Sequence, residues 1–469
     1  MTMNHTSIHQ RDKQTKGHDL THGTIGKELW SLAWPMMLSV FFYTLYNVVD
    51  TYWVSKLSAE AIAAVSISQI TLFVMISLGF GLIVGSGVIM AMHIGAKNIK
   101  EAERVLGQSF VLSAMMGVVF TIIGLVLRNQ LLTASGASGL IFAPALEYYT
   151  IVTGGSLLMF IMMTIMFAFN SQGDTNTLTK MFALSTLINV ILDPIMIFGW
   201  QGFPALGISG AAIATLISQG VFTVIALRSL SNVRRKIRFR FANFSFQWQS
   251  VKKVLDIGVP ASLTQMIFPI GLAALTYIAS LRFMEPGAIA FSLGFRIEFF
   301  AYLPAVGFGF AAMAMIGQNI GAGNIARARE SFRKGLWYSF FAAFGLGIIA
   351  ALFAGPLIGV FTTNQIVVQY AQLYLWSVAL SYGFLAALMV EATSFQAIGR
   401  SWPGFWIFII RVFVISVPLS YLLTMVLGFP IIALWLSIAA GNVISAVLGY
   451  FWITRALNKI DLQEVPVRS

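Results

Sequence analysis

The hexapeptide Ile94-Gly95-Ala96-Lys97-Asn98-Ile99 returns as Ile320-Gly321-Ala322-Gly323-Asn324-Ile325, so that Gly95 and Gly321 lie 226 positions apart. Further pairs repeat at or near this spacing: Tyr148 with Tyr374, Gly173 with Gly399, and Gly202-Phe203-Pro204 with Gly428-Phe429-Pro430. Self-similarity at a fixed offset indicates a duplicated structural unit. The chain is therefore predicted to consist of two equivalent halves.

Composition places both halves in a membrane. Of the 469 residues, 58% are hydrophobic and 10% are charged, which is too apolar for a soluble surface. A window of about 19 residues finds twelve apolar segments, at about 29–56, 61–92, 105–127, 141–168, 176–199, 206–228, 254–281, 287–316, 334–359, 368–396, 403–427 and 430–454. We predict an all-α integral membrane protein with twelve transmembrane helices in two parallel six-helix repeats, an architecture that supports alternating access.

Basic residues set the expected orientation. Nearly all of the 29 lysines and arginines fall in the tails and in connections on one side, whereas the opposite connections carry Lys56, Arg128 and Arg282. The positive-inside rule then places both termini in the cytoplasm. The expected organisation is a cytoplasmic tail over 1–26, an N-lobe over 27–228, a cytoplasmic linker over 229–250, a C-lobe over 251–455 and a cytoplasmic tail over 456–469. Residues 1–26 lack the apolar core and cleavage site of a signal peptide.

The net charge of +12 does not require a nucleic-acid partner. In the linker, Arg235, Arg238 and Arg240 alternate with phenylalanines such as Phe239 and Phe241, a pattern that can bind single strands. Between two membrane spans, the same pattern is expected to rest on anionic lipids of the inner leaflet. We expect membrane lipids as partners and no nucleic acid.

The sequence lacks the residues that several classes of enzyme require. The chain contains no cysteine, and four of its five histidines lie in the first 22 residues, so neither a metal site nor a Cys nucleophile is predicted. A phosphate loop of the GxxxxGK[ST] type is also absent from the sequence. We predict that the protein is not an enzyme, has no cofactor and draws energy from an ion gradient.

Two carboxylates distinguish the halves. Aligning Pro35 with Pro260 places Asp50 opposite Leu275, and aligning Pro194 with Pro418 places Asp193 opposite Val417. An acid inside a membrane span is a functional-site candidate, because charge in hydrocarbon is costly. Both acids lie at a similar distance from the outer ends of their spans, so a site in the N-lobe alone is predicted.

Polar neighbours accompany these acids. Tyr46 and Asn47 precede Asp50 by four and three residues, and Asn189 precedes Asp193 by four, spacings that share a helix face. Desolvation and a nearby like charge favour a neutral carboxyl group, so the pair is expected to exchange a proton as a coupled unit. The same oxygens could hold Na⁺ on Asp50 and Asp193, and a static polar network is the remaining alternative.

Prolines and further charges complete the candidates. Pro35 and Pro194 lie within spans and are expected to act as helix-bending hinges. The C-lobe spans contain Arg296, Glu298, Glu391 and Arg411, for which a neutralised structural or gating network is expected. We predict that these four charges form a polar network in the C-lobe.

The assembled motifs resemble the multidrug and toxic compound extrusion (MATE) transporters, in particular their DinF-like bacterial branch. The resemblance covers about 27 to 455 and rests on Pro35 with Tyr46-Asn47-x-x-Asp50, on Asn189-x-x-x-Asp193-Pro194, and on Gln172-Gly173-Asp174 with the two Gly-Ala-x-Asn turns. It implies an exporter that expels cationic or amphipathic drugs in exchange for protons, or for sodium in some members. It also implies a cation site formed by Tyr46, Asp50, Asn189, Asp193 and Thr215, on a first helix that bends on protonation.

The resemblance further implies a monomer in the bacterial inner membrane. It leaves open sodium coupling and a lipid or lipid-linked saccharide flippase, which the same superfamily contains. A flippase is expected to line its cavity with basic residues for pyrophosphate, and only Arg296 and Arg411 are available within the spans.

Overall fold

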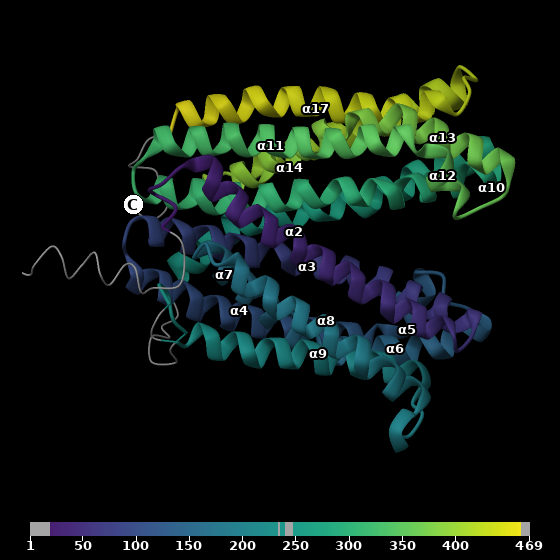
Figure 1. The fold of residues 1–469 in the computed structure, drawn as a ribbon, viewed down its shortest axis with the longest axis horizontal. Coiled ribbons are helices and arrows are strands. Elements are labelled where there is room, and N and C mark those ends of the chain that lie inside the picture. The colour runs from purple at the N-terminus through teal and green to yellow at the C-terminus, as the bar shows by residue number, and fades with distance from the viewer. Residues whose placement is uncertain (1–18, 233–234, 240–246, 461–469) are drawn as a thin grey trace, which may run out of the picture. The chain divides into compact units, whose positions relative to one another are not determined.

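A computed structural model describes residues 19–232, 235–239 and 247–460. These residues form helices joined by short turns (Figure 1). The expectations for most of the N-terminal tail, for Phe241 and Arg240 in the linker, and for most of the C-terminal tail concern residues outside these ranges.

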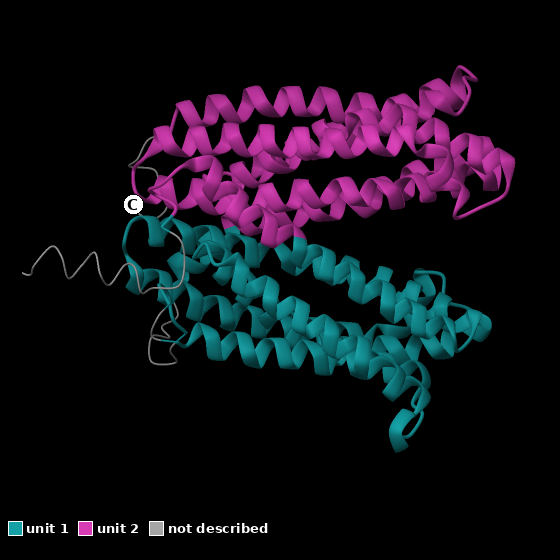
Figure 2. Cartoon of the chain, viewed as in Figure 1, with its two compact units in different colours: residues 1–19, 38–255 teal, residues 20–37, 256–469 magenta. Residues whose placement is uncertain are grey.

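The described residues divide into two compact units (Figure 2). Unit 1 covers 38–255 of the described chain, and unit 2 covers 20–37 and 256–460. Helix α2, Ile25–Ser55, passes from unit 2 to unit 1 between Met37 and Leu38. The other elements of unit 1 are α3 (Ala59–Gly95), α4 (Ile99–Val126), α5 (Arg128–Ala134), η1 (Gly139–Ile141), α6 (Phe142–Gly154), α7 (Ser156–Ser171), α8 (Thr175–Phe198), η2 (Trp200–Gly202) and α9 (Gly207–Leu230).

Unit 2 repeats this order of helices. After the first turns of α10, which belong to unit 1, its elements are α10 (Trp248–Gly321), α11 (Ile325–Leu352), α12 (Ala354–Gly359), α13 (Gln365–Val378), η4 (Ala379–Ser381), α14 (Tyr382–Ala397), α15 (Trp402–Ile409), the π-helical η5 (Ile410–Ser416), α16 (Val417–Tyr421), the π-helical η6 (Leu422–Val426) and α17 (Ile432–Asn458).

The membrane spans agree with the sequence prediction. Ten helices of the described chain are long and apolar enough to cross a membrane, and α6 with α7 forms one more span, bent by 52°. Helix α10 has 74 residues and a non-helical break at Met284. At about 1.5 Å per residue it would be roughly 110 Å long, several times the hydrocarbon thickness. Counting α10 as two spans brings the total to twelve, so the predicted twelve-helix fold is confirmed.

The duplication is visible in the helix boundaries. Helices α4 and α11 both have 28 residues and begin 226 positions apart, at Ile99 and Ile325. Helices α7 and α14 both end at this spacing, at Ser171 and Ala397. Equivalent turns therefore shape equivalent helices, although the two halves differ at most positions.

The repeated Gly-Ala-x-Asn motif forms the turn between two helices in each copy. The left-handed backbone conformation falls on the third residue, Lys97 with φ 58° and Gly323 with φ 79°. The asparagine instead begins the following helix, and the Asn324 side chain accepts a hydrogen bond from the backbone N–H of Arg327 at 3.2 Å. The asparagine is thus an N-cap residue, and in the second copy its side chain satisfies a free N–H group at the start of the helix.

Part of the linker is fixed to unit 1 through Arg235. Its guanidinium group forms a buried salt bridge with Asp174, donates to the Ser229 hydroxyl at 2.7 Å and lies 4.8 Å from the centre of the Phe169 ring. Burial lowers the pKa of Arg235 to about 10, so it remains charged at neutral pH. Two residues further on, the backbone N–H of Ile237 donates to Gln172 at 3.1 Å. The Gln172-Gly173-Asp174 turn therefore anchors the linker.

We predict that Arg235→Ala destabilises the protein by about 3–5 kcal/mol, because it leaves the buried Asp174 carboxylate without its partner. Thermal unfolding of the purified protein in detergent measures the loss. Arg104→Ala is the control, since the Arg104–Glu101 pair is about one-third exposed and contributes about 0.5 kcal/mol or less. Equal effects of the two substitutions would contradict the anchoring role of Arg235.

Candidate cation site

Three helices of unit 1 carry the predicted cation-site residues. Asp50 lies on α2, Asp193 and Asn189 on α8, and Thr215 on α9. The side chain of Asp50 is 2% exposed and that of Asp193 is fully buried. Helices α2 and α8 are joined by a hydrogen bond between the Ser39 and Thr179 hydroxyls at 2.9 Å, several turns away from the acids. The fold thus brings two distant acids into one buried region.

Hydrogen bonds within the protein satisfy only some of the polar atoms in this region. Asn189 donates from Nδ2 to Asp193 Oδ1 at 2.9 Å. Three further oxygens, Asp50 Oδ1, Asn189 Oδ1 and Asp193 Oδ2, are buried without a hydrogen-bond partner in the described chain, whereas the Tyr46 hydroxyl interacts with the side chain of Thr215. Buried polar groups are otherwise nearly always paired. Unpaired carboxylate and amide oxygens are hydrogen-bond acceptors, so this group is a candidate site for a proton or a cation.

Electrostatics connects these atoms into one cluster. The carboxylates of Asp50 and Asp193 are close enough to repel each other, and Asp50 also interacts with the Tyr46 hydroxyl. Within the part of the chain that the structure describes, no basic side chain is among the electrostatic partners of either acid. Two acids without a base repel each other strongly when both are ionised in a low-dielectric interior. Bound protons or a monovalent cation relieve that repulsion.

Tyr148, on α6, was not among the predicted site residues. Its buried hydroxyl interacts with both Asp50 and Asp193 and contacts the side chain of Gln69. The sequence contained a signal for it, since Tyr148 and Tyr374 are a repeated pair. In unit 2, the Tyr374 hydroxyl donates to the Glu298 carboxylate. A tyrosine facing an acid is thus common to both units.

Asn47 lies differently from its predicted neighbours. It is only half-buried, and its side-chain amide donates to the backbone carbonyl of Tyr43 at 2.7 Å. This local bond turns the amide toward its own helix, a common alternative for asparagine. The structure brings Tyr46 to Asp50 and uses the Asn47 amide elsewhere.

The two predicted hinge prolines lie inside continuous helices. Pro35 is within α2 and Pro194 is within α8, directly after Asp193. Each removes one backbone hydrogen bond from its helix. The Thr186 hydroxyl on α8 donates to the Phe42 backbone carbonyl on α2 at 3.2 Å. This bond joins the two helices at a point that follows Pro35 in α2 and precedes Pro194 in α8.

In unit 2, Glu298 and Arg411 line a cavity of about 40 Å³ together with Tyr374. Arg411 donates from Nε to Asn442 Oδ1 at 2.7 Å and interacts electrostatically with Glu298. Arg411 lies on the π-helical η5, a conformation frequent at functional sites. Glu298 therefore has both a hydrogen-bond donor and a countercharge, unlike the two acids of unit 1.

The other two residues of the expected C-lobe network lie apart from this pair. Arg296 is exposed. Glu391 on α14 is fully buried, and neither of its carboxyl oxygens has a hydrogen-bond partner in the described chain. Its Oε2 occupies the space beside Gly449 of α17, 2.0 Å from where a Cβ at position 449 would lie. Glycine at 449 thus makes room for the acid.

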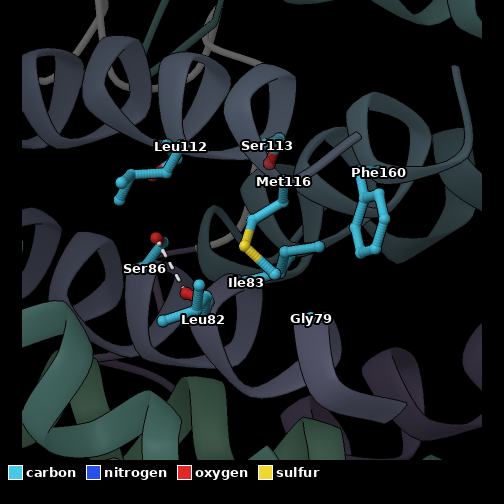
Figure 3. A pocket seen from close by; sticks show the side chains of 9 residues that line it. Gly79, Leu82, Ile83, Ser86, Leu112, Ser113, Met116 and Phe160 are labelled. Atoms are coloured by element: carbon cyan, nitrogen blue, oxygen red, sulfur yellow. Dashed lines mark hydrogen bonds between the residues drawn. The ribbon is translucent and has the colours of Figure 1, made fainter. Parts of the chain in front are cut away.

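A second close approach explains the glycines of α3. A Cβ added at Gly79 would lie 2.1 Å from the Phe160 ring, which agrees with helix packing through small residues. Figure 3 shows Gly79 and Phe160 beside a cavity of about 10 Å³ that Ser86 and Ser113 also line. A space of this volume holds at most one water molecule. It is a packing defect of unit 1 rather than a substrate site.

These features define a class of protein, a multi-pass α-helical transporter built from two repeats with a buried acidic cluster. A family profile described as MatE matches residues 35–195 and 260–422. The chain belongs to the MatE family, and its members are transporters rather than enzymes.

Known proteins resemble this chain over nearly its full length. A FAD transporter of Shewanella oneidensis is 27% identical and covers 93% of this chain, with 96% of its own length matched. A probable multidrug resistance protein, NorM, of Thermotoga maritima is 26% identical over 90% of this chain and 91% of its own. A solved MOP superfamily transporter from Pyrococcus furiosus superposes with a TM-score of 0.89 at 26% identity, covering 96% of this chain and 99% of that one.

We predict that Gly449→Ala lowers stability by about 1–3 kcal/mol, as overpacking in a core does, because its methyl group collides with the Glu391 carboxyl. Gly345→Ala on α11 is the matched control, since a Cβ there meets nothing within 4 Å. Melting temperatures of both variants in detergent provide the measurement. Adding Glu391→Ala to Gly449→Ala should recover part of the loss, and a double variant less stable than Gly449→Ala alone would contradict the steric explanation.

Proposed function

We propose that this protein exports cationic or amphipathic small molecules in exchange for protons that bind Asp50 and Asp193. The observation that supports the proposal is the buried cluster of unit 1, in which both acids have an oxygen without a partner. A base within the cluster would neutralise the acids permanently, and none interacts with them. The charge of the cluster is therefore free to change with its ligand.

Exchange follows from competition for this negative charge. When protons occupy the acids, the cluster is neutral and attracts a cationic substrate weakly. When the protons leave, the carboxylates favour a cation. Because the two states differ in affinity for the substrate, proton binding can drive release, and the coupling is reciprocal. Tyr46, Asn189, Thr215 and Tyr148 supply neutral oxygens and hydroxyls around both states.

Conformational change is assigned to the proline-containing helices. We propose that protonation of Asp50 alters the bend of α2 at Pro35, with Pro194 allowing α8 to follow. The halves 27–228 and 251–455 then act as the N-lobe and C-lobe of an alternating-access cycle. Asn47 contributes to the polar surface beside this site, and the pair of Glu298 and Arg411 serves as a neutral structural or gating element.

Two alternatives share the same fold. Na⁺ could take the place of the proton, because carboxylate and neutral oxygens are suitable ligands for a hard cation. A relative named a FAD transporter makes a planar, anionic substrate a second candidate, but the cavity beside Arg411 does not support it, because its volume is about 40 Å³ and Arg411 is paired with Glu298. A lipid-linked saccharide flippase has less support, because only Arg296 and Arg411 are available as basic residues for a pyrophosphate.

The cellular setting is part of the proposal. The basic residues favour a bacterial inner membrane protein with both termini in the cytoplasm. Such a protein works as a monomer, because each chain has a complete cluster in unit 1.

Transport by purified protein in liposomes tests this function. With a proton gradient imposed, wild-type protein should move a fluorescent cationic dye, and Asp50→Asn should lower the rate at least tenfold while still binding the dye. The asparagine keeps the shape but cannot exchange a proton. Asp256→Asn, which changes an exposed acid, is the matched control and should transport normally.

Separate gradients distinguish the alternatives. Dye movement driven only by Na⁺ would assign Asp50 and Asp193 to a metal cation. Movement of FAD but not of the dye would show that the substrate is a planar anion rather than a cation. Full dye export by Asp50→Asn would refute the proposed role of this acid.

A further inference from the structure

A second, larger cavity lies in unit 2, between the beginning of α11 and the end of α17. Its volume is about 400 Å³, and its lining includes Arg329, Arg333 and Glu330 of α11 and Tyr450 and Thr454 of α17. These residues are far in sequence from Asp50 and Asp193 and lie in the other unit. The cavity is therefore separate from the proposed coupling site.

The lining has an excess of positive charge. Glu330 is paired with Lys334 at 2.8 Å, so its charge is compensated on its own helix. Arg329 donates from Nε to the backbone carbonyl of Leu457 at 3.2 Å, which uses only part of its five N–H donors. Arg333 is exposed and is one of the residues that line the cavity. Two guanidinium groups at one cavity can bind a phosphate group in a bidentate manner.

The remaining lining suits a hydroxylated headgroup. Thr454 Oγ1 is buried without a hydrogen-bond partner in the described chain. Phe332 stacks on Tyr450 with ring centres 6.2 Å apart and provides an apolar wall. The cavity thus offers donors for a phosphate, a hydroxyl group for a polar substituent and a flat surface for hydrocarbon.

An exposed apolar stripe continues from the cavity along α11. Trp337 and Phe341 follow Arg333 at intervals of four residues, which places the three side chains on one face of the helix. Their exposed fractions are 45% for Trp337 and 62% for Phe341, and the two rings stack at 5.5 Å. In a membrane-spanning helix, such a face contacts acyl chains.

We propose that this cavity binds the phosphate headgroup of an anionic phospholipid, whose acyl chains lie along the Trp337–Phe341 stripe. Basic pockets between transmembrane helices on the cytoplasmic side bind such headgroups. The proposal rests on the cytoplasmic orientation given under Proposed function, because anionic lipids are then available at this end of α11. It does not depend on the coupling ion or on the transported substrate.

Native mass spectrometry of the detergent-purified full chain tests the proposal without a gradient. Phosphatidylglycerol is titrated against the wild type, against Arg329→Ala/Arg333→Ala, and against the control Arg128→Ala/Arg282→Ala, which removes two exposed arginines elsewhere. The first variant should lose roughly tenfold in affinity, as expected for lost charge-assisted hydrogen bonds, and the control should change little. Arg333→Ala alone keeps the Arg329 bonds to α17 and should lose a smaller part.

Three results would overturn the assignment. The first is equal loss in both double variants, which would indicate general charge attraction. The second is equal affinity for zwitterionic phosphatidylethanolamine, which would show that the net charge of the lipid is not recognised. The third is displacement of the lipid by inorganic phosphate at equal concentration, which would make the cavity a free-phosphate site. A transport-inactive protein that still shows the expected pattern would contradict the export proposal alone.

Discussion

The structure depends on one constraint, that a polar group buried between apolar helices needs a partner. Backbone groups meet it through helix hydrogen bonds, which is why twelve helices form the membrane region. Side chains meet it in two different ways. In unit 2, Glu298 receives a hydrogen bond from Tyr374 and the countercharge of Arg411. In unit 1, no base of the described chain interacts with Asp50 or Asp193, and in the proposed function a proton or a cation supplies the missing charge.

Duplication makes this difference informative. Helices α4 and α11 have the same length and the equivalent turns occur at the same spacing, so both units use one backbone plan. On that common plan, Tyr148 faces the acids of unit 1 and Tyr374 faces the acid of unit 2. The tyrosine is shared, and the countercharge is not. This difference supports the proposal that the acids of unit 1 exchange a proton, whereas Glu298 is paired with Arg411.

Patterns with a fixed period were readable from the sequence. Hydropathy located the spans, and the repeated Gly-Ala-x-Asn turn identified the halves, because both depend on local composition. The acids of the cation site were found for the same reason, since charge inside an apolar span is visible without a structure. What remained hidden depended on side-chain direction. Asn47 has the right spacing to face Asp50 but bonds to the Tyr43 carbonyl.

Tertiary contacts were equally hidden from the sequence. Arg235 belonged to a basic linker in which nothing marked it as buried, yet it anchors that linker to Asp174. Lys97 adopts a left-handed conformation at the position where the second copy has Gly323. Because lysine seldom adopts this conformation, the residue type of the first copy alone did not predict it. The burial of Arg235 and the conformation of Lys97 depend on which groups lie close together in the folded protein. Spacing along the chain does not determine these contacts.

Helix α2 connects the ion-binding cluster to the rest of the molecule. Its residues up to Met37 belong to unit 2 and those from Leu38 onward to unit 1, so Asp50 lies on an element that both units share. Pro35, two residues before this change of unit, removes a backbone hydrogen bond and makes the helix easiest to bend near that point. On the unit 2 side, Trp30 packs edge-on against Phe308 at 5.0 Å, which holds the beginning of α2 in place. The proposed response to a change of charge at Asp50 is a bend near Pro35, because the helix is packed at its beginning against Phe308 and lacks one backbone hydrogen bond at the proline.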